Sequence, residues 1–279
     1  MKFNNLKIFI FVAILITLLA SCTAERELAR EFVKTKKSIP VLLLTTNRLI
    51  LTNDKLKKIP NYDSLNVSTQ DSIWLVKTLY LDSVSDVRFI QMFYSKLKTE
   101  LQFYGFIVYE QDSLQSFNAL ESTKYTLNLA QVEMSEDDYN YRDQEVFFNS
   151  LVYYQDNTLN AVNLNFWFEF SSSGFKNEKL FYTTFSVNDK LESRFLLDNS
   201  TNKVSYQFKI TPIVLNEIYQ LSEYAAVKSS NYFFNYLMNS YVKENMPSNA
   251  GIPKYFSYDR YTGFLFNNEN DSFIELNSK

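Results

Sequence analysis

Residues 162–170 read VNLNFWFEF, and this stretch decides the fold class. Apolar side chains occupy every second position, and polar or amphipathic side chains fill the positions between them. A period of two places Val162, Leu164, Phe166, Phe168 and Phe170 on one face of a β-strand. Residues 125–130, 181–187 and 204–210 show the same pattern. Such strands are typical of an antiparallel sheet with one solvated face.

Two stretches predict helices that cover this sheet. Residues 86–104 repeat apolar side chains at spacings of three and four, between a capping Ser85 and Gly105. Residues 212–246 have an apolar stripe in their second half, start with a proline and end before Pro247. Their polar run at 228–231 is a candidate break in the helix.

We therefore expect an α+β fold: a single domain with a mainly antiparallel sheet packed with two main helical regions. The domain covers residues 38–279 and includes an irregular C-terminal tail from about residue 247, where Pro and Gly recur. The predicted core comprises Leu43, Ile90, Leu97, Leu127, Leu164, Phe166, Phe168, Phe208 and Leu237.

Composition excludes most catalytic chemistry. The chain has 279 residues, 46% of them hydrophobic and 17% aromatic, which is enough to bury a core and too aromatic for a disordered chain. It has no histidine, four glycines and one cysteine. Histidine-based triads, zinc clusters, disulfides and glycine-rich phosphate loops therefore lack their residues. We expect no metal, no cofactor and no enzymatic activity.

The N-terminus predicts secretion. Lys2 and Lys7 precede an apolar run from Ile8 to Ala20, which is shorter than the roughly 20 residues that span a bilayer as a helix. A positive start, a short apolar run and small residues after it are typical of a signal peptide. The small residues here are Ala20 and Ser21, and the only cysteine, Cys22, follows them directly.

Leu19-Ala20-Ser21-Cys22 resembles the lipobox of bacterial lipoproteins. The resemblance implies that residues 1–21 are removed and that Cys22 is acylated on its sulfur and on its new amine. Thr23 stands where an aspartate would imply retention at the inner membrane, so the resemblance implies the outer membrane. An ordinary signal peptide with an incidental cysteine, or an uncleaved short anchor, are the alternatives. We expect residues 22–37 to form the lipidated N-terminus and a tether, either as a solvated chain or as a frayed helix.

The mature charge argues against nucleic acid as a partner. Cleavage after residue 21 removes Lys2 and Lys7, so Lys+Arg falls from 28 to 26 while Asp+Glu stays at 31, and the net charge becomes −5. An acidic chain lacks the basic patch that nucleic-acid binding requires. The expected partners are the lipid bilayer, through acylated Cys22, and another envelope protein or a glycan.

Residues 133–154 combine acidic and tyrosine side chains. The acidic cluster is Glu133, Glu136, Asp137, Asp138, Asp143 and Glu145. The stretch from Asp138 starts like a calcium loop but has Arg142 at its fifth position, so we interpret the cluster as a solvated connection between strands. The candidate binding residues are Tyr139, Tyr141, Tyr153 and Tyr154, because tyrosines on polar loops offer contact area at low entropic cost.

The favoured function is a membrane-anchored, non-catalytic binding or assembly module of the cell envelope. The order of predicted elements over residues 38–170 resembles the small α/β domains of lipoproteins that assist envelope assembly. The alternative is a cell-surface carbohydrate-binding protein, or a hydrolase that depends on paired carboxylates.

Overall fold

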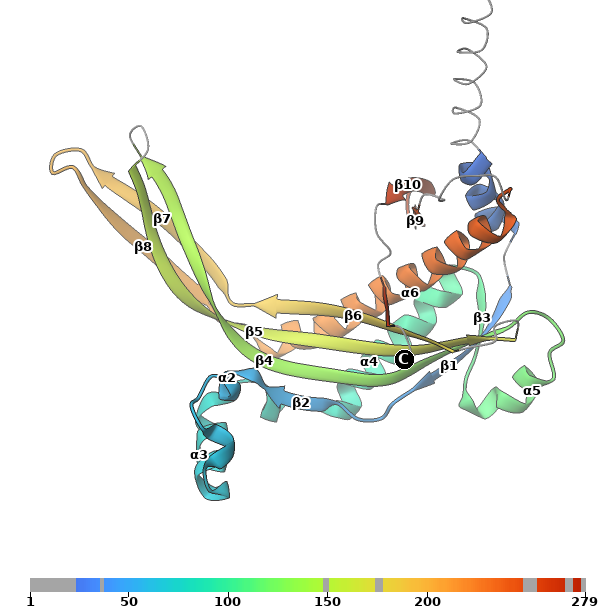
Figure 1. Cartoon of the computed structure of the whole chain (residues 1–279), viewed down its shortest axis with the longest axis horizontal. Helices are drawn as coiled ribbons and strands as arrows, with labels where there is room; N and C mark the ends of the chain where they lie inside the picture. The colour runs from blue at the N-terminus through green and yellow to red at the C-terminus, as the bar shows by residue number, and fades with distance from the viewer. Residues whose placement is uncertain are drawn as a thin grey trace, which may run out of the picture.

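A seven-stranded sheet forms the centre of the protein in the computed structural model (Figure 1). The structure describes residues 24–35, 38–147, 151–173, 178–247, 255–268 and 273–276; the predicted signal peptide and Cys22 lie outside them. The strand order is β11-β6-β5-β4-β1-β3, and β2 also pairs with β4. The strands of this sheet are β1 (Ile39–Thr45), β2 (Ile50–Asn53), β3 (Phe106–Tyr109), β4 (Tyr125–Phe147), β5 (Leu151–Ser172), β6 (Lys179–Asn188) and β11 (Ile274–Leu276).

The pairing confirms a mainly antiparallel sheet in an α+β fold. β4, β5, β6 and β11 are antiparallel neighbours. At the other edge β1 is parallel to β3 and β4, and β2 is parallel to β4. The long connection between β1 and β3 contains the first covering helix, as a parallel crossover requires.

Two long helices pack on the apolar face of this sheet. α4 (Asp86–Phe103) starts where predicted, with the Ser85 hydroxyl accepting from the amide of Arg88. It ends at Phe103, and Gly105, two residues later, has a φ of 90°, which suits a residue without a side chain. α6 (Leu215–Asn245) is continuous, so the expected break at 228–231 is wrong: Ser229 and Ser230 are buried, and the Ser230 hydroxyl bonds back to the carbonyl of Val227.

The predicted core is confirmed at every position except one. Leu43, Ile90, Leu97, Leu127, Leu164, Phe166, Phe168 and Leu237 are all buried. Phe93 of α4 stacks on Phe166 of β5 with ring centroids 4.8 Å apart, which joins helix and sheet. Phe208 is 57% exposed, so its place in the core is wrong. It lies on β8 (Lys203–Thr211), which pairs with β7 (Lys190–Asp198) in a separate hairpin.

Both ends of the domain are more ordered than predicted. Residues 24–35 form a helix, one of the two expectations for this stretch, but its Ala29 and Phe32 are buried where we expected a solvated segment. Phe32 packs edge-on against Phe234 of α6 at 5.5 Å. The expected irregular tail contains a hairpin of β9 (Tyr255–Asp259) and β10 (Phe264–Asn268), besides β11.

Side chains of α6 hold that hairpin. Asn239 donates to the carbonyl of Phe256 and accepts from its amide, both at 2.9 Å, as a neighbouring strand would. Asn235, one turn earlier, accepts from the amide of Tyr258 at 2.9 Å. Asparagines four residues apart on one helix face therefore replace a missing strand partner.

Shorter elements surround the sheet. α2 (Asp54–Lys57) and α3 (Val67–Lys77) form a lobe at the end of β2, in which α3 hangs below the sheet in Figure 1, and α5 (Leu114–Asn118) follows β3. Short 3₁₀ turns lie at Tyr62–Ser64, Leu81–Ser83 and Gln111–Ser113. Within the described ranges, no helix is long and apolar enough to cross a membrane.

Candidate functional site

Two hairpins project from the body and form a feature that we call the arm. It consists of residues 137–147 of β4, residues 151–160 of β5, and the β7–β8 hairpin. β2 pairs with β4 only as far as Glu136, and β6 pairs with β5 only from Ala161 onward. Beyond these points β4 and β5 pair with each other alone. The arm leaves the end of the body opposite the helix of residues 24–35 (Figure 1).

A buried ion pair fixes β4 where the arm begins. Lys55 of α2 and Glu136 have side chains 6% and 0% exposed, with Nζ 2.6 Å from Oε1. The same carboxylate accepts from the amides of Leu79 and Tyr80 at 3.0 Å. The acidic cluster lies within β4, so its interpretation as a connection between strands is wrong. Its interpretation as solvated is also wrong for Glu136, which organises the connection between α3 and α4.

Asp189 fixes the second hairpin at its base. This residue joins β6 to β7 and is 6% exposed. Its Oδ2 accepts from the amide of Asn160 at 2.9 Å and from the Asn160 side chain at 2.8 Å, and its Oδ1 accepts from the amide of Ile213 at 3.0 Å. Burial, followed by the nearby Asp189 and Glu136 carboxylates, raises the pKa of Tyr80 to about 12.

The four predicted binding tyrosines all lie on the arm. The register places Tyr139, Tyr141 and Tyr153 on one face of the β4–β5 ribbon, and Tyr154 on the other. The first face is turned toward the β7–β8 hairpin, because Asp143 and Asn157 on that face bond to Ser193 at 2.5 Å and to the Tyr206 hydroxyl at 2.9 Å. We call it the inner face.

The outer face carries a structured charge pair. Arg142 binds Asp156 through two hydrogen bonds of 2.7 and 2.9 Å, and its guanidinium lies 4.5 Å from the ring centroid of Tyr154. This contact lowers the pKa of Asp156 and raises that of Arg142. The tyrosines remain available for contact: Tyr139, Tyr141 and Tyr154 are 37%, 44% and 60% exposed.

Sequence reasoning missed the aliphatic side chains at the end of the ribbon. Val146, Leu151 and Val152 are 63%, 58% and 54% exposed, and together with Tyr154 we call them the tip cluster. Val146 is paired with Val152, and both lie on the outer face, whereas Leu151 lies on the inner face. The signal was present as apolar residues on both sides of residues 148–150 in the sequence, but strand alternation alone predicted one buried face.

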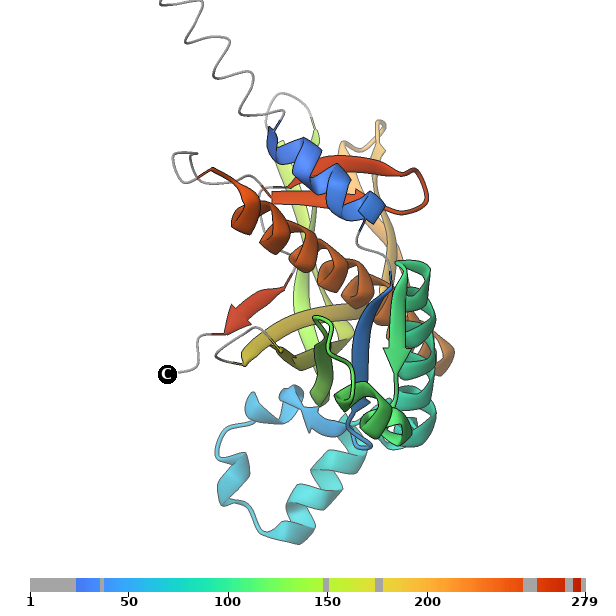
Figure 2. The same ribbon diagram turned by 90° about the vertical axis from the view of Figure 1, so that its right-hand side faces the viewer.

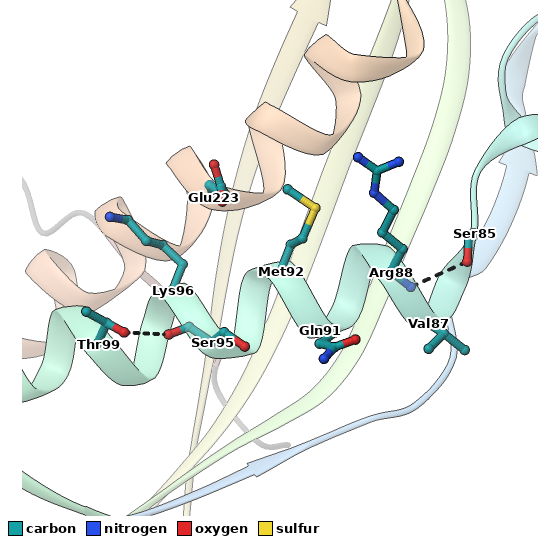
Figure 3. Close-up of a pocket in the computed structure, with 9 residues that line it drawn as sticks. All are labelled: Ser85, Val87, Arg88, Gln91, Met92, Ser95, Lys96, Thr99 and Glu223. Atoms are coloured by element: carbon teal, nitrogen blue, oxygen red, sulfur yellow. Dashed lines mark hydrogen bonds between the residues drawn. The ribbon is translucent and has the colours of Figure 1, made fainter.

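A groove on the surface of the body runs along α4. It is a groove of about 570 Å³ lined by Ser85, Val87, Arg88, Gln91, Met92, Ser95, Lys96, Thr99 and Glu223 (Figure 3). Lys96 extends toward α6, and its Nζ lies 3.0 Å from Oε1 of Glu100. Ser95 and Lys96 do not suit a nucleophile and its base, because adjacent residues on a helix do not face each other and Lys96 is paired with Glu100.

The solvated face of the sheet holds a small aromatic and amide group. Trp167 of β5 and Tyr182 of β6 are cross-strand neighbours with ring centroids 5.1 Å apart. The Tyr182 hydroxyl donates to Asn165 at 2.7 Å, and Asn128 donates to Glu169 at 2.7 Å. No group of metal-ligating side chains occurs in the part of the chain that the structure describes.

Comparisons with known proteins give little guidance. No protein-family model matches the chain, and no curated protein sequence matches it significantly. Among solved structures, it matches a Helicobacter pylori protein described as a candidate neuraminyllactose-binding hemagglutinin homolog. The identity is 12% and the TM-score 0.33, over 75% of this chain and 95% of that chain. A match this distant carries no argument about function.

Proposed function

We propose that the protein is a non-catalytic binding module of the cell envelope, anchored by lipid at Cys22, which contacts another envelope component through its arm. The observation that carries the proposal is the exposure of tyrosine and aliphatic side chains on the arm. Concentrated exposed apolar surface marks interaction sites on soluble domains. Tyrosine is also among the residues that dominate binding energy at interfaces.

The arm is held in place before any partner binds. Asp189 and Glu136, both buried, hold the bases of its two hairpins with hydrogen bonds of 2.6–3.0 Å. Because the base of the ribbon is fixed, binding does not have to include the conformational entropy cost of ordering the ribbon. Preorganisation of this kind improves affinity by lowering the entropic cost of binding.

Lipid anchoring is tested by replacing the cysteine. Cys22→Ser removes the sulfur that would carry the acyl chains, and it should leave the protein in the soluble fraction or as an unprocessed precursor. Several chains anchor far more firmly than one, so wild type should remain in the outer-membrane fraction. Equal metabolic labelling of wild type and variant by a fatty-acid analogue would reject the proposal of lipidation.

Binding through the arm is tested by site-specific crosslinking. A photoreactive amino acid is placed at Tyr141 on the inner face, and at Ser64 in the lobe of α2 and α3 as the control. In intact cells we expect a discrete adduct from position 141 and none from 64. Tyr139→Ala combined with Tyr141→Ala should weaken the capture with little change in melting temperature. Identical adducts from 141 and 64, or none from either, would count against the arm.

A second candidate function rests on Trp167 and Tyr182. A half-buried ring pair next to amide and carboxylate side chains suits the apolar face and hydroxyls of a sugar. If the solvated sheet face binds a glycan, Trp167→Ala should abolish retention on that glycan in an array. Tyr182→Phe, which keeps the ring, should retain most of it. Unchanged retention by Trp167→Ala would remove this candidate.

A further inference from the structure

We propose that the tip cluster enters the headgroup region of the bilayer that holds acylated Cys22, so that the protein touches one membrane at two points. The inference rests on the proposed function, because it assumes the lipid anchor. It names the envelope component that the end of the arm contacts: a lipid surface.

The distribution of apolar side chains favours lipid over a protein groove. Val146 and Val152 lie on the outer face of the ribbon and Leu151 on the inner face, and each is more than half exposed. A docked protein normally covers one face of a ribbon, which would leave the other apolar face in water. A bilayer surrounds an inserted tip on all sides, so it accounts for both faces at once.

The length of the tip cluster along the strands matches the depth of the membrane–water interface. Two to three residues of each strand, at about 3.3 Å a residue, span roughly 7–10 Å. This matches the depth of about 5–10 Å to which interfacial elements bury their apolar side chains. Tyr154 and the Arg142–Asp156 pair follow further from the tip. Tyrosine at the boundary is typical of membrane interfaces. The exposed Glu145, which pairs with Tyr153 next to the tip, would lie at the level of the polar headgroups.

The shape of the molecule places this tip and the helix of residues 24–35 on the same side. In Figure 1 the helix of residues 24–35 stands at the upper right and the arm rises to the upper left. Figure 2, turned about the vertical axis, also shows both at the top. Only Thr23 separates Cys22 from Ala24, the first residue described, and two residues reach at most about 7 Å. One flat bilayer can therefore meet both ends of the molecule.

A lobe on the opposite side provides a matched control. Leu75 of α3 is 70% exposed, more than Leu151, and α3 hangs at the bottom of both views. A lipid surface above the molecule reaches position 151 and leaves position 75 in water. Comparing positions 151 and 75 thus distinguishes nonspecific lipid binding by any exposed leucine from a defined orientation of the protein on the membrane.

The experiment uses the full chain, processed and lipidated, in vesicles of phosphatidylethanolamine and phosphatidylglycerol. Leu151→Cys and Leu75→Cys are each labelled with an environment-sensitive thiol dye; acylated Cys22 has no free thiol, and the unsubstituted protein serves as the labelling blank. We expect a blue shift and strong quenching by nitroxide-bearing lipid at 151, with neither at 75. Adding Val146→Asp and Val152→Asp to Leu151→Cys should abolish most of the quenching.

Three results would overturn the inference. Quenching of 151 no greater than that of 75 would show that the tip is not oriented into lipid. A blue shift without quenching would show that a protein surface covers the tip. Persistent quenching in the doubly charged variant would show that the aliphatic side chains do not drive insertion. Failure of the anchor is read separately, because Cys22→Ser alone reports it; the labelled variant with added vesicles then tests the tip without the anchor.

Discussion

Removing the buried charge of Glu136 should destabilise the protein more than any change in its exposed ion pairs. Its carboxylate is fully buried, and it holds the Lys55 ammonium at 2.6 Å and two backbone amides at 3.0 Å. Glu136→Gln keeps the shape but leaves a buried ammonium without a counter-charge. Breaking one side of a buried pair typically costs about 3–5 kcal/mol. For a domain of this size that corresponds to a fall in melting temperature on the order of 10 °C.

The assay is urea unfolding of a double-mutant cycle. Lys55→Met retains most of the aliphatic stem, so Lys55→Met with Glu136→Gln should lose clearly less than the sum of the two single losses. Asp138→Asn, which affects a half-exposed pair with Lys58, is the control and should cost under about 1 kcal/mol. Additive losses in the cycle, or a loss below about 1 kcal/mol for Glu136→Gln, would refute the reasoning. Faster amide exchange at Leu79 and Tyr80 should accompany the loss.

Three further outcomes are expected. Phe166→Ala should cost about 3–5 kcal/mol in chemical unfolding because its ring is fully buried, whereas Phe208→Ala, on the exposed hairpin, should stay within about 0.5 kcal/mol. The pKa of Tyr80 is about 12 against an ordinary 10.0, so its neutral hydroxyl stabilises the fold fully below pH 10.0, and this contribution is lost as the pH rises toward 12. Tyr80→Phe should flatten that part of the stability profile. Asn239→Ala should leave two backbone groups of Phe256 unpaired, cost about 1–3 kcal/mol, and speed amide exchange at Phe256.

Period and capping were enough to predict the body of the fold. The alternation at residues 162–170 predicted β5 and its buried face, because a strand between a helix layer and solvent has one apolar side. Ser85 and Gly105 located both ends of α4, since caps act locally. The predictions of α4 and of the buried face of β5 were correct because these local signals agree with each other.

The same local logic could not distinguish a buried strand face from an exposed one. Phe208 alternates as cleanly as Phe168, but burial depends on what covers the strand, and the β7–β8 hairpin stands outside the main sheet. Glu136 was grouped with its acidic neighbours because Lys55, its partner, is 81 residues away in sequence. The packing of the helix of residues 24–35 against α6 was not predicted, because it is likewise a long-range contact.

The position of the arm links stability to the proposed membrane contact. Asp189 connects β6 to the β7–β8 hairpin, and it accepts three hydrogen bonds from Asn160 and Ile213. Asp189→Asn replaces one carboxylate oxygen with a donor and should leave one of these groups unsatisfied, at a cost of about 1–3 kcal/mol.

If the arm must be held upright for its tip to reach the bilayer, this variant should reduce lipid quenching at position 151 although no tip residue has changed. Asp198→Asn, which disturbs only the bonds to Ser200 and Thr201 in the distal turn, should leave the quenching as in wild type. Equal quenching in both variants would mean that the tip finds lipid without a fixed base, and the arm would then act as a flexible tether.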